Sequence, residues 1–470
     1  MQFNSYEFIL FFLPITVLLY YGANKINPVI GKMVIVISSI VFYSLGRMNM
    51  LIYLGISIVL NYAFAVVIKR LKIKVKILLI LPIIVNVGLL LYFKYLNFAI
   101  TNINILLGKR FELQEIILPL GISFYTFQQI AYIVATEREE LENNNIIDYL
   151  AYILYFPKLV MGPIIDPVDY ISQLNQCNRK KVDIVNITKG VKIFSLGLIK
   201  KVLLADTFAG GVAWAYANIE VATAMDCILL MLFYTFEIYF DFSGYSDMAV
   251  GVSWMFNIDL PMNFNSPYKA ISIRDFWKRW HISLTKFLTK YIYIPLGGSR
   301  KGIIFTYMNI IIVFGVSGLW HGASWNFILW GVLHGLFSCF DRIFEYIEEK
   351  VFMPVRWLCT FGVTSTLWLL FSAQTVEQWK TILIKIVFMQ NTAVSDGMIN
   401  SFNLVESQFI YNILGLNYLP TNVRGFNMIA FILIACFLCF VPENNYEKSE
   451  KLNISSLFLS AFAFIWGILC

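Results

Sequence analysis

Long uninterrupted apolar runs constrain this chain more than any other feature. A helix that crosses the hydrocarbon core of a bilayer needs roughly 20 apolar residues, and helices are expected because the backbone in lipid must satisfy its own hydrogen bonds. The clearest runs are Phe8–Tyr21, Met33–Leu45, Met50–Ile68, Ile77–Phe93, Ile116–Val134, Ile147–Ile165, Ile228–Phe240, Ile303–Trp320, Ser324–Phe340, Trp357–Phe371, Met428–Val441 and Leu457–Leu469. Several are short, so some must tilt, re-enter or pair. We predict an all-α polytopic membrane protein with about eleven crossings.

The composition agrees with that class. The chain is 59% hydrophobic and only 14% charged, with a mean hydropathy of +0.70, whereas soluble domains are about a quarter charged. The sequence contains no internal repeat and no hydrophilic domain. We therefore predict one membrane domain over residues 1–470, with a motif-bearing core at about 116–340 and carboxyl-terminal helices at 354–470. Any chemistry must then come from groups within or at the edge of the bilayer.

The basic residues indicate topology rather than a nucleic-acid partner. Each basic cluster flanks a hydrophobic span, and by the positive-inside rule these clusters face the cytoplasm. The predicted cytoplasmic segments are the loop with Lys69, Arg70, Lys72, Lys74 and Lys76, the segment with Arg179, Lys180, Lys181, Lys200 and Lys201, and residues 269–301. The same count places the loop with Lys25 and Lys32 inside, and the amino terminus and the loop with Arg47 outside. The amino terminus lacks the positive region of a cleavable signal peptide, so Phe8–Tyr21 is expected to remain as a first helix.

All three histidines lie between residues 281 and 334. His321 stands within Trp320-His-Gly322, near the middle of a stretch without charge that runs from 302 to 340. A histidine at that depth is costly unless it is paired or lines a watered cavity. The low dielectric favours the neutral imidazole, which can accept a proton. These considerations leave a catalytic base and a structural histidine equally open, whereas His334 is expected to pack between helices.

The segment Ile271–Lys290 is predicted to form an amphipathic surface helix. One face carries Arg274, Lys278, His281 and Thr285, and the adjacent apolar face carries Trp277, Trp280, Leu284 and Leu288. Tryptophans beside cations are typical of a membrane–water interface. The segment is therefore an anchor, and a sharper hypothesis makes His281 a second catalytic group. In that hypothesis an anionic donor is attracted by Arg274, Lys278, Arg279, Arg300 and Lys301.

A third cluster, Phe240-Asp-Phe-Ser-Gly-Tyr-Ser-Asp247, ends an apolar run. Asp241, Tyr245 and Asp247 are candidates to support a histidine, and Ser243, Gly244 and Ser246 favour a turn or a helix cap. We expect no metal site, because the only paired cysteines, Cys436 and Cys439, lie inside an apolar run. The motifs of serine hydrolases, ATPases and zinc proteases are absent from the sequence.

Five motifs in order resemble the membrane-bound O-acyltransferase superfamily. They are Pro119-Leu-Gly-Ile-Ser-Phe-Tyr-Thr-Phe-Gln128, Phe240-Asp-Phe-Ser-Gly-Tyr-Ser-Asp-Met-Ala249, Arg274-Asp-Phe-Trp-Lys-Arg-Trp-His-Ile-Ser283, Tyr293-Ile-Pro-Leu-Gly-Gly298 and Trp320-His-Gly-Ala-Ser-Trp-Asn-Phe-Ile-Leu-Trp330. Within that superfamily the pattern is most similar to the bacterial alginate O-acetyltransferase group. The resemblance implies a ring of helices around a thin central region, with a funnel from each face. It also implies that His321 is the catalytic histidine and that His281 is the second motif histidine.

The resemblance further implies the reaction and its participants. We expect a multi-pass protein of the bacterial cytoplasmic membrane that binds no resident cofactor and uses acetyl-CoA as its cosubstrate. The acetyl group would pass to a hydroxyl acceptor for O-acetylation of an extracellular or cell-wall polysaccharide, through an exported acetyltransferase or esterase-like partner. Two alternatives stay open: D-alanyl transfer to teichoic acid from a carrier protein, and a polysaccharide or lipid transporter without catalysis. Matching broken helices in two repeated halves would favour the transporter, and the sequence shows none.

Overall fold

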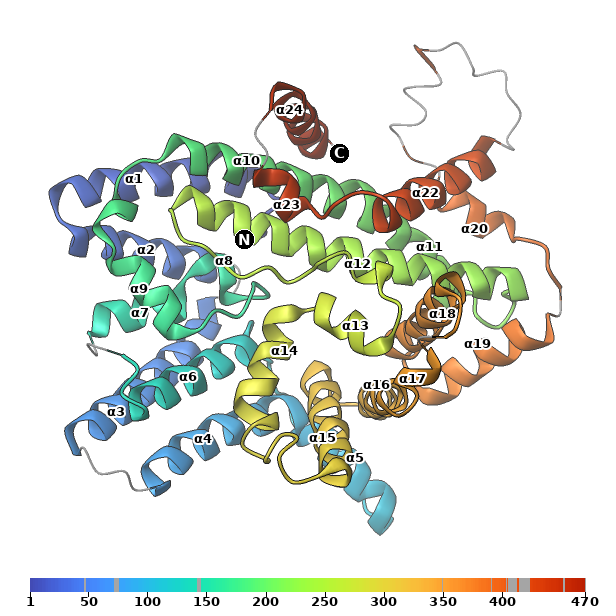
Figure 1. Ribbon diagram of the computed structural model, residues 1–470, viewed down its shortest axis with the longest axis horizontal. Helices are drawn as coiled ribbons and strands as arrows, with labels where there is room; N and C mark the ends of the chain where they lie inside the picture. Colours follow the sequence, from blue (N-terminus) through green and yellow to red (C-terminus); the bar gives the residue numbers. More distant parts are fainter. Residues whose placement is uncertain are drawn as a thin grey trace. The chain divides into compact units, whose positions relative to one another are not determined.

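A computed structural model describes residues 1–45, 48–71, 76–141, 145–348, 350–389, 391–402, 404, 412, 413, 423–450 and 453–469. Within them every regular element is a helix and none is a strand (Figure 1). This confirms the all-α prediction. The contacts divide the chain into two compact units, the first with Met1–Phe194 and Ser246–Met262 and the second with Ser195–Tyr245 and Asn263–Cys470. The predicted positions Arg47, Lys72 and Lys74, and much of 390–424, lie outside the described residues.

The first unit is built from the amino-terminal helices. They are α1 (Leu13–Ile26), α2 (Pro28–Ser44), α3 (Leu51–Leu71), α4 (Lys76–Leu90), α5 (Leu96–Leu107), α6 (Ile122–Glu137), α7 (Ile146–Leu154), α8 (Phe156–Leu159), α9 (Pro167–Asn175) and most of α10 (Ile184–Ile199). Short π-helices at Glu7–Phe12 and Leu91–Tyr95 lead into α1 and α5. In this unit α1 packs along α2, and α3 and α4 pack on α6.

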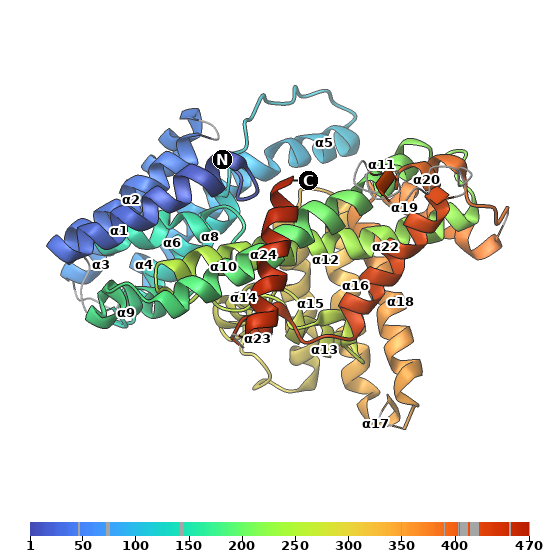
Figure 2. The same ribbon diagram turned by 90° about the horizontal axis from the view of Figure 1, so that it is seen from above.

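The second unit holds the motif-bearing segments and the carboxyl-terminal helices. They are α11 (Asp206–Ala217), α12 (Ala224–Met255, whose last residues belong to the first unit), α13 (Ile273–Arg279), α14 (Ile282–Leu288), α15 (Ile303–His321), α16 (Trp325–Ile343), α17 (Glu345–Glu348), α18 (Met353–Ser372), α19 (Val376–Phe388), α20 (Asp396–Asn400), α22 (Val423–Phe440), α23 (Asn445–Glu450) and α24 (Ile454–Leu469). Figure 2 shows the same helices from above. Two π-helices, Lys200–Ala205 and Thr289–Tyr293, precede α11 and follow α14.

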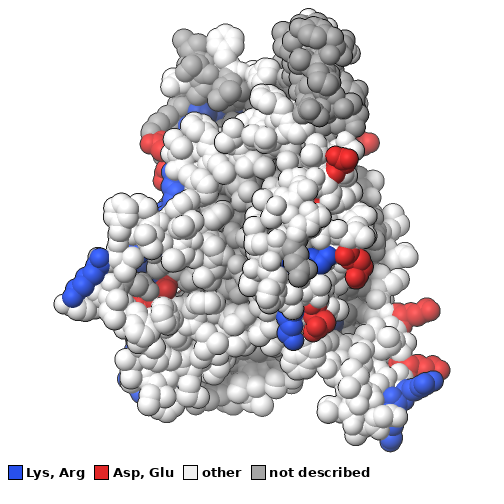
Figure 3. Space-filling view, turned by 90° about the vertical axis from the view of Figure 1, so that its right-hand side faces the viewer, with Lys and Arg blue, Asp and Glu red and all other residues white. Residues whose placement is uncertain are grey.

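Five helical segments in the described part of the chain are long and apolar enough to cross a membrane. They are Glu7–Ile26, Met48–Leu71, Ile77–Leu107, Ala224–Met255 and Ile303–His321. Two further apolar helices, Pro28–Ser44 and Gly425–Phe440, are shorter. Many large apolar side chains lie on the surface, and Figure 3 shows one face with few charges between wide uncharged areas. These features are those of a multi-pass membrane protein, whereas the ring of about eleven crossings stays a prediction.

Several predicted boundaries differ from the helices that form. The run Ile147–Ile165 is not one crossing, because α7 ends at Leu154 and the short α8 starts a separate turn after Tyr155. Pro157 occupies the first turn of α8, where its missing N–H costs nothing. The helices α10, α11 and α19 were not expected, because lysines and glycines interrupt their apolar pattern.

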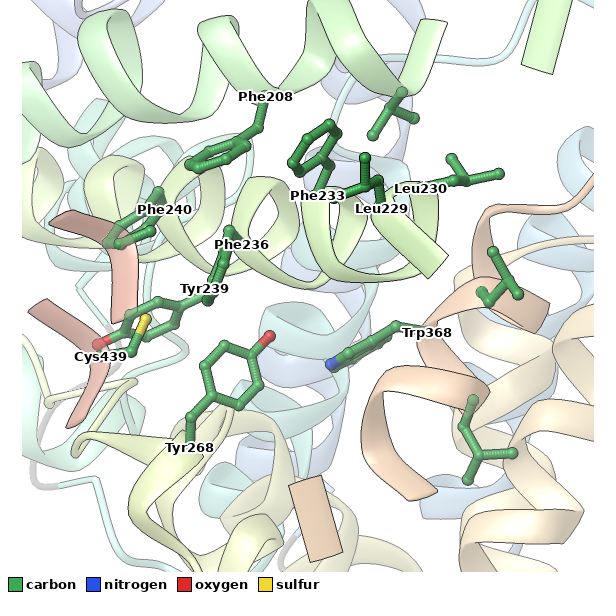
Figure 4. Packing of buried hydrophobic residues seen from close by; sticks show 14 of the residues in the cluster. Phe208, Leu229, Leu230, Phe233, Phe236, Tyr239, Phe240, Tyr268, Trp368 and Cys439 are labelled. Atoms are coloured by element: carbon green, nitrogen blue, oxygen red, sulfur yellow. The ribbon is translucent and has the colours of Figure 1, made fainter. Parts of the chain in front are cut away.

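An aromatic core fills the second unit around α12 (Figure 4). Phe208 of α11 packs against Phe233 and Phe236 of α12, with ring centroids 5.5 and 5.4 Å apart. Tyr268 is fully enclosed by this core, and its hydroxyl donates to the Thr235 carbonyl over 2.6 Å. Because a buried tyrosine hydroxyl is costly without a partner, this bond fixes the segment before α13 against α12.

Helices α15 and α16 pack more extensively on each other than any other helix pair in the described residues. Glycines let their backbones touch: a Cβ on Gly318 would overlap the Phe327 carbonyl, and one on Gly331 would overlap the Phe314 carbonyl. Small residues at a helix crossing are the usual means of close approach in membranes. This crossing lies one turn before His321.

We expect Gly318→Ala to destabilise the protein by ~1–3 kcal/mol, because the added methyl group has no space at the crossing. Gly315→Ala is the matched control on the same helix, since its Cβ would meet its nearest neighbour only at 4.0 Å. Alanine should there be neutral or stabilising by up to ~1 kcal/mol. Thermal unfolding of the detergent-purified proteins measures both, and equal shifts in the two variants would contradict the close crossing.

Candidate active site

His321 is the last residue of α15 and is half-buried. Aromatic rings surround its imidazole edge-to-face: Trp320 at 4.8 Å, Trp330 of α16 at 5.2 Å and Phe371 of α18 at 5.1 Å between ring centroids. The Asn326 side chain donates to the Ala373 carbonyl and ties the start of α16 to the end of α18. The histidine therefore stands at the end of a candidate membrane span, held on several sides by rigid apolar groups.

His281 occupies a break in the chain, and the prediction of one amphipathic helix over Ile271–Lys290 is wrong. Helix α13 ends at Arg279, α14 begins at Ile282, and His281 has a left-handed backbone with φ +43°. Such a conformation is unfavourable for a non-glycine residue and persists only where neighbours enforce it. The helical spacing of 274, 278, 281 and 285 therefore does not place these residues on one face.

Backbone hydrogen bonds on both sides enforce this break. The Asn265 N–H donates to the Arg279 carbonyl over 2.9 Å, and the Ile282 N–H donates to the Asn263 carbonyl over 3.0 Å. The Asn263 side chain also accepts from the Ser283 N–H at 3.2 Å. The non-helical segment before α13 thus holds the residues that flank His281 in place, through hydrogen bonds that helical periodicity does not predict.

The His281 side chain is buried rather than on a surface, with 1% of its area exposed. Its ring packs edge-to-face on Phe242 of α12 at 4.7 Å. Neither ring nitrogen has a hydrogen-bond partner among the described residues. Burial lowers the pKa of His281 to about 3, so the imidazole is neutral at physiological pH.

Trp320 connects the two motif histidines. Its ring lies 6.1 Å from that of His281 and 4.8 Å from that of His321, between ring centroids. The chain thus brings residues 281 and 321, which are far apart in sequence, into contact with the same indole ring. Apolar surroundings of this kind exclude water and strengthen any hydrogen bond formed to a substrate.

His334 lies in the aromatic core of α16 and is fully buried. Its Nδ1 accepts a hydrogen bond of 3.2 Å from the Trp277 indole N–H. Its ring also packs on Trp330 at 4.9 Å and on Trp277 at 5.1 Å. These contacts fit the packing role expected from the sequence.

The five candidate donor-binding cations have different environments. Arg274 pairs with Glu345 at 3.0 Å, and Arg279 pairs with Asp275 at 2.9 Å. Lys278, Arg300 and Lys301 are exposed. Salt bridges within the protein engage the two arginines, so the three exposed residues are the better placed to meet an anion.

The cluster Phe240–Asp247 is neither a turn nor a cap, because α12 continues through it to Met255. A Cβ on Gly244 would lie only 2.8 Å from the Gly197 carbonyl oxygen of α10, so this glycine allows the two helices to pack closely. Asp241 pairs with Lys201 at 2.6 Å, and Lys201 also binds Asp206 at 2.8 Å. Lys201 is thus the ionic partner of Asp241 in the described part of the chain, and support of a histidine by Asp241 stays a prediction. Tyr245 lies on α12 in the second unit, and Asp247 on its continuation in the first.

A small apolar cavity of about 220 Å³ adjoins these elements. Its lining residues come from the α13–α14 segment, the π-helix that follows it, and α15: Trp277, Leu284, Thr285, Leu288, Thr289, Tyr293, Ile310, Val313, Phe314 and Ser317. Leu284 and Leu288 belong to the apolar face predicted from the sequence, but helical periodicity does not predict that they lie opposite α15. Ser317 lies one helical turn before His321, so the cavity reaches the same helix end.

The chain matches the profile of the membrane-bound O-acyltransferase family over residues 88–377. It belongs to that family. The matched range includes all five motifs and both motif histidines, which confirms the resemblance, and the chain is accordingly an acyltransferase.

Relatives of this chain include proteins named for O-acetylation and a protein named for D-alanylation. The peptidoglycan O-acetyltransferase of Helicobacter pylori is 36% identical over 99% of this chain and 95% of its own length. A probable alginate O-acetylase of Pseudomonas aeruginosa is 36% identical over 80% of this chain and 73% of its own length. The teichoic acid D-alanyltransferase of Streptococcus thermophilus is 28% identical over 47% of this chain and 56% of its own length.

The burial of neutral His281 predicts a loss of stability in acid. The unfolded chain takes up a proton on this residue below pH ~6.5, whereas the folded protein resists doing so until about pH 3. Folding therefore weakens as pH falls through that window, by about 2 kcal/mol at pH 5. We expect His281→Gln to lose less stability than the parent between pH 7 and pH 5 in thermal unfolding. An identical acid sensitivity in both proteins would show that His281 is not buried as a neutral base.

Proposed function

We propose that this protein transfers an acetyl group from a cytosolic thioester to a hydroxyl acceptor, with His321 as the general base. The observation that carries the proposal is the position of His321. It stands half-exposed at the end of a candidate membrane span, among rings that hold its imidazole in place. A fixed imidazole with partial access is what proton abstraction from a hydroxyl requires.

In the proposed reaction the acceptor oxygen attacks the thioester carbonyl while its proton passes to the His321 imidazole. The new C–O bond forms, the C–S bond breaks, and the thiolate receives the proton from His321. One imidazole thus acts first as base and then as acid. Positioned proton transfer of this kind contributes typically about 10²–10⁴-fold to a rate.

His281 is proposed to assist at the carbonyl. A neutral imidazole carries one N–H donor, and a buried donor without a partner costs about 1–3 kcal/mol. The His281 nitrogens have no acceptor among the described residues. A thioester carbonyl would supply the missing acceptor, and the hydrogen bond would strengthen as negative charge develops on that oxygen.

We further propose acetyl-CoA as the donor, with Lys278, Arg300 and Lys301 attracting its phosphates. Exposed cations and a cytoplasmic position by the positive-inside rule support this choice. Arg274 and Arg279 would contribute less, because each already pairs with a carboxylate. An acyl carrier protein would present a similar phosphopantetheine thioester to the same cations.

The acceptor is proposed to be an extracellular or cell-wall polysaccharide, reached through an exported acetyltransferase or esterase-like partner. The names of the relatives from Helicobacter pylori and Pseudomonas aeruginosa support a glycan acceptor. The setting proposed is the bacterial cytoplasmic membrane, with a ring of about eleven crossings and a funnel from each face. D-alanyl transfer is the second candidate, supported by a relative that matches less than half of this chain.

We expect His321→Ala to reduce acetyl transfer by at least about 10²-fold, because the reaction loses its base. Label transfer from radiolabelled acetyl-CoA by the purified membrane protein measures the rate, and a carrier-bound D-alanyl thioester is the competing donor. His334→Gln is the control, because it alters another histidine of the same aromatic core outside the proposed chemistry. Near-parental transfer by a folded His321→Ala protein would refute the mechanism, and transfer only from the D-alanyl donor would refute the choice of acyl group.

We expect Lys278→Gln to raise the KM for acetyl-CoA about two- to fivefold with little change in kcat, the effect of losing one exposed charge pair. Lys286→Gln on α14 is the matched control, since Lys286 is also exposed but lies outside the proposed set of donor-binding cations. Steady-state kinetics at several ionic strengths measure both. Equal effects of the two substitutions would show a general charge effect and not a donor contact.

A further inference from the structure

The first unit, which contains none of the histidines, has a large cavity of about 1170 Å³ that is partly open to the outside. Helices α2, α3, α7 and α9 form its walls, and its lining residues are Lys32, Tyr62, Val66, Lys69, Arg70, Glu140, Leu141, Asn145, Asp148, Val168, Ile171, Ser172, Asn175 and Gln176. Small-molecule sites commonly measure about 300–1,000 Å³. The cavity is therefore large enough for a ligand with a polar head.

The inner wall of this cavity is a buried and balanced polar network. Lys32 donates to Asp148 and to the Asn175 side-chain oxygen, each over 2.5 Å, and the Asn175 amide donates to Asp148 at 3.3 Å. Lys32 and Asp148 are only 8% and 4% exposed. Because these two charges compensate each other, the inner wall offers hydrogen bonds rather than a net charge.

The rim of the cavity carries an excess of basic side chains, and its one exposed carboxylate, that of Glu140, pairs with Arg138 at 3.8 Å. Lys69 and Arg70 lie exposed in the last turn of α3, and the Arg70 guanidinium has no ion pair or hydrogen bond to any residue that the structure describes. A guanidinium binds phosphate oxygens through paired N–H groups. The charge at the rim thus favours an anion with phosphate geometry.

The rim lies at the end of a membrane span. Helix α3 belongs to the candidate span Met48–Leu71, and its basic end is cytoplasmic by the positive-inside rule. While Tyr62 and Val66 of α3 line the cavity, Val59, Val67 and Leu71 of the same helix are apolar and exposed. A ligand with a phosphate head and hydrocarbon tails would meet both surfaces. A soluble phosphate would use only the cavity.

We propose that this cavity binds the head group of an anionic phospholipid from the cytoplasmic leaflet. Arg70 and Lys69 contact the phosphate. The polar side chains of Asn145, Ser172 and Asn175 form hydrogen bonds with the hydroxyl groups of a glycerol head. The acyl chains lie along the exposed apolar side of α3. Basic pockets between membrane helices on the cytoplasmic side are the kind of site that anionic head groups occupy.

The test measures binding of phosphatidylglycerol to the full-length protein in detergent, by native mass spectrometry and by thermal stabilisation. We expect Arg70→Gln to weaken binding at least about fivefold, and Arg70→Lys, which keeps the charge but loses the paired donors, to weaken it less. Lys69→Gln should also weaken binding. Lys25→Gln is its matched control, because Lys25 is exposed at the end of α1, on the same predicted side, and does not line the cavity.

Phosphatidylcholine is expected to bind weakly, because its head group carries no net charge. Unchanged phosphatidylglycerol binding in Arg70→Gln, or an equal loss in Lys25→Gln, would overturn the proposal.

Inorganic phosphate and adenosine 3′,5′-bisphosphate form a separate arm of the experiment. If either protects the parent as well as the lipid does, and Arg70→Gln abolishes that protection, the cavity takes a soluble phosphate ligand and the lipid assignment is wrong.

Discussion

The backbone contact between α15 and α16 is the constraint on which the candidate site depends. Gly318 and Gly331 bring the two helices together at the level of their facing carbonyls, so the end of α15 has a fixed position on Trp330. His321 follows Gly318 by three residues, and its ring therefore meets Trp330 and Phe371. In lipid, where there is no hydrophobic drive between helices, such close packing is what holds helices together. The reactivity proposed for His321 thus rests on two residues without side chains.

His281 reaches its contact with Trp320 by a different means. Hydrogen bonds from the non-helical segment before α13 hold its backbone in a left-handed conformation, and its ring contacts Phe242 and Trp320. A helix through this point would place residue 281 on the face shared with Lys278, where it would meet solvent. The break directs the His281 side chain into the apolar core instead. The strain of the backbone and the burial of two unpaired nitrogens are both costs, and both are expected where a site is prepared for a ligand.

The helical class and most of the apolar helices could be predicted from the sequence, because hydropathy reports the length of a span directly. Helix ends and breaks were less predictable. The apolar pattern does not show that α12 continues past Asp241, where Lys201 from another part of the chain pairs with the carboxylate. Likewise the pattern of 271–290 suggests one helix, because the hydrogen bonds that break it come from residues 263 and 265. The motif histidines could be named from the sequence, but their shared contact with Trp320 could not, because tertiary packing creates it.

The ionic partner of Asp241 also bears on which mechanism the fold supports. A serine-protease-like relay uses a carboxylate to orient a histidine and to stabilise its charged form. In the described part of the second unit, the Asp241 carboxylate binds a lysine, and His281 is enclosed by rings. Apolar surroundings penalise an imidazolium, so the enclosed His281 is neutral and suited to donate one N–H rather than to hold an extra proton. In the proposed mechanism the thioester carbonyl oxygen would therefore be stabilised by a neutral N–H donor rather than by a charged pair.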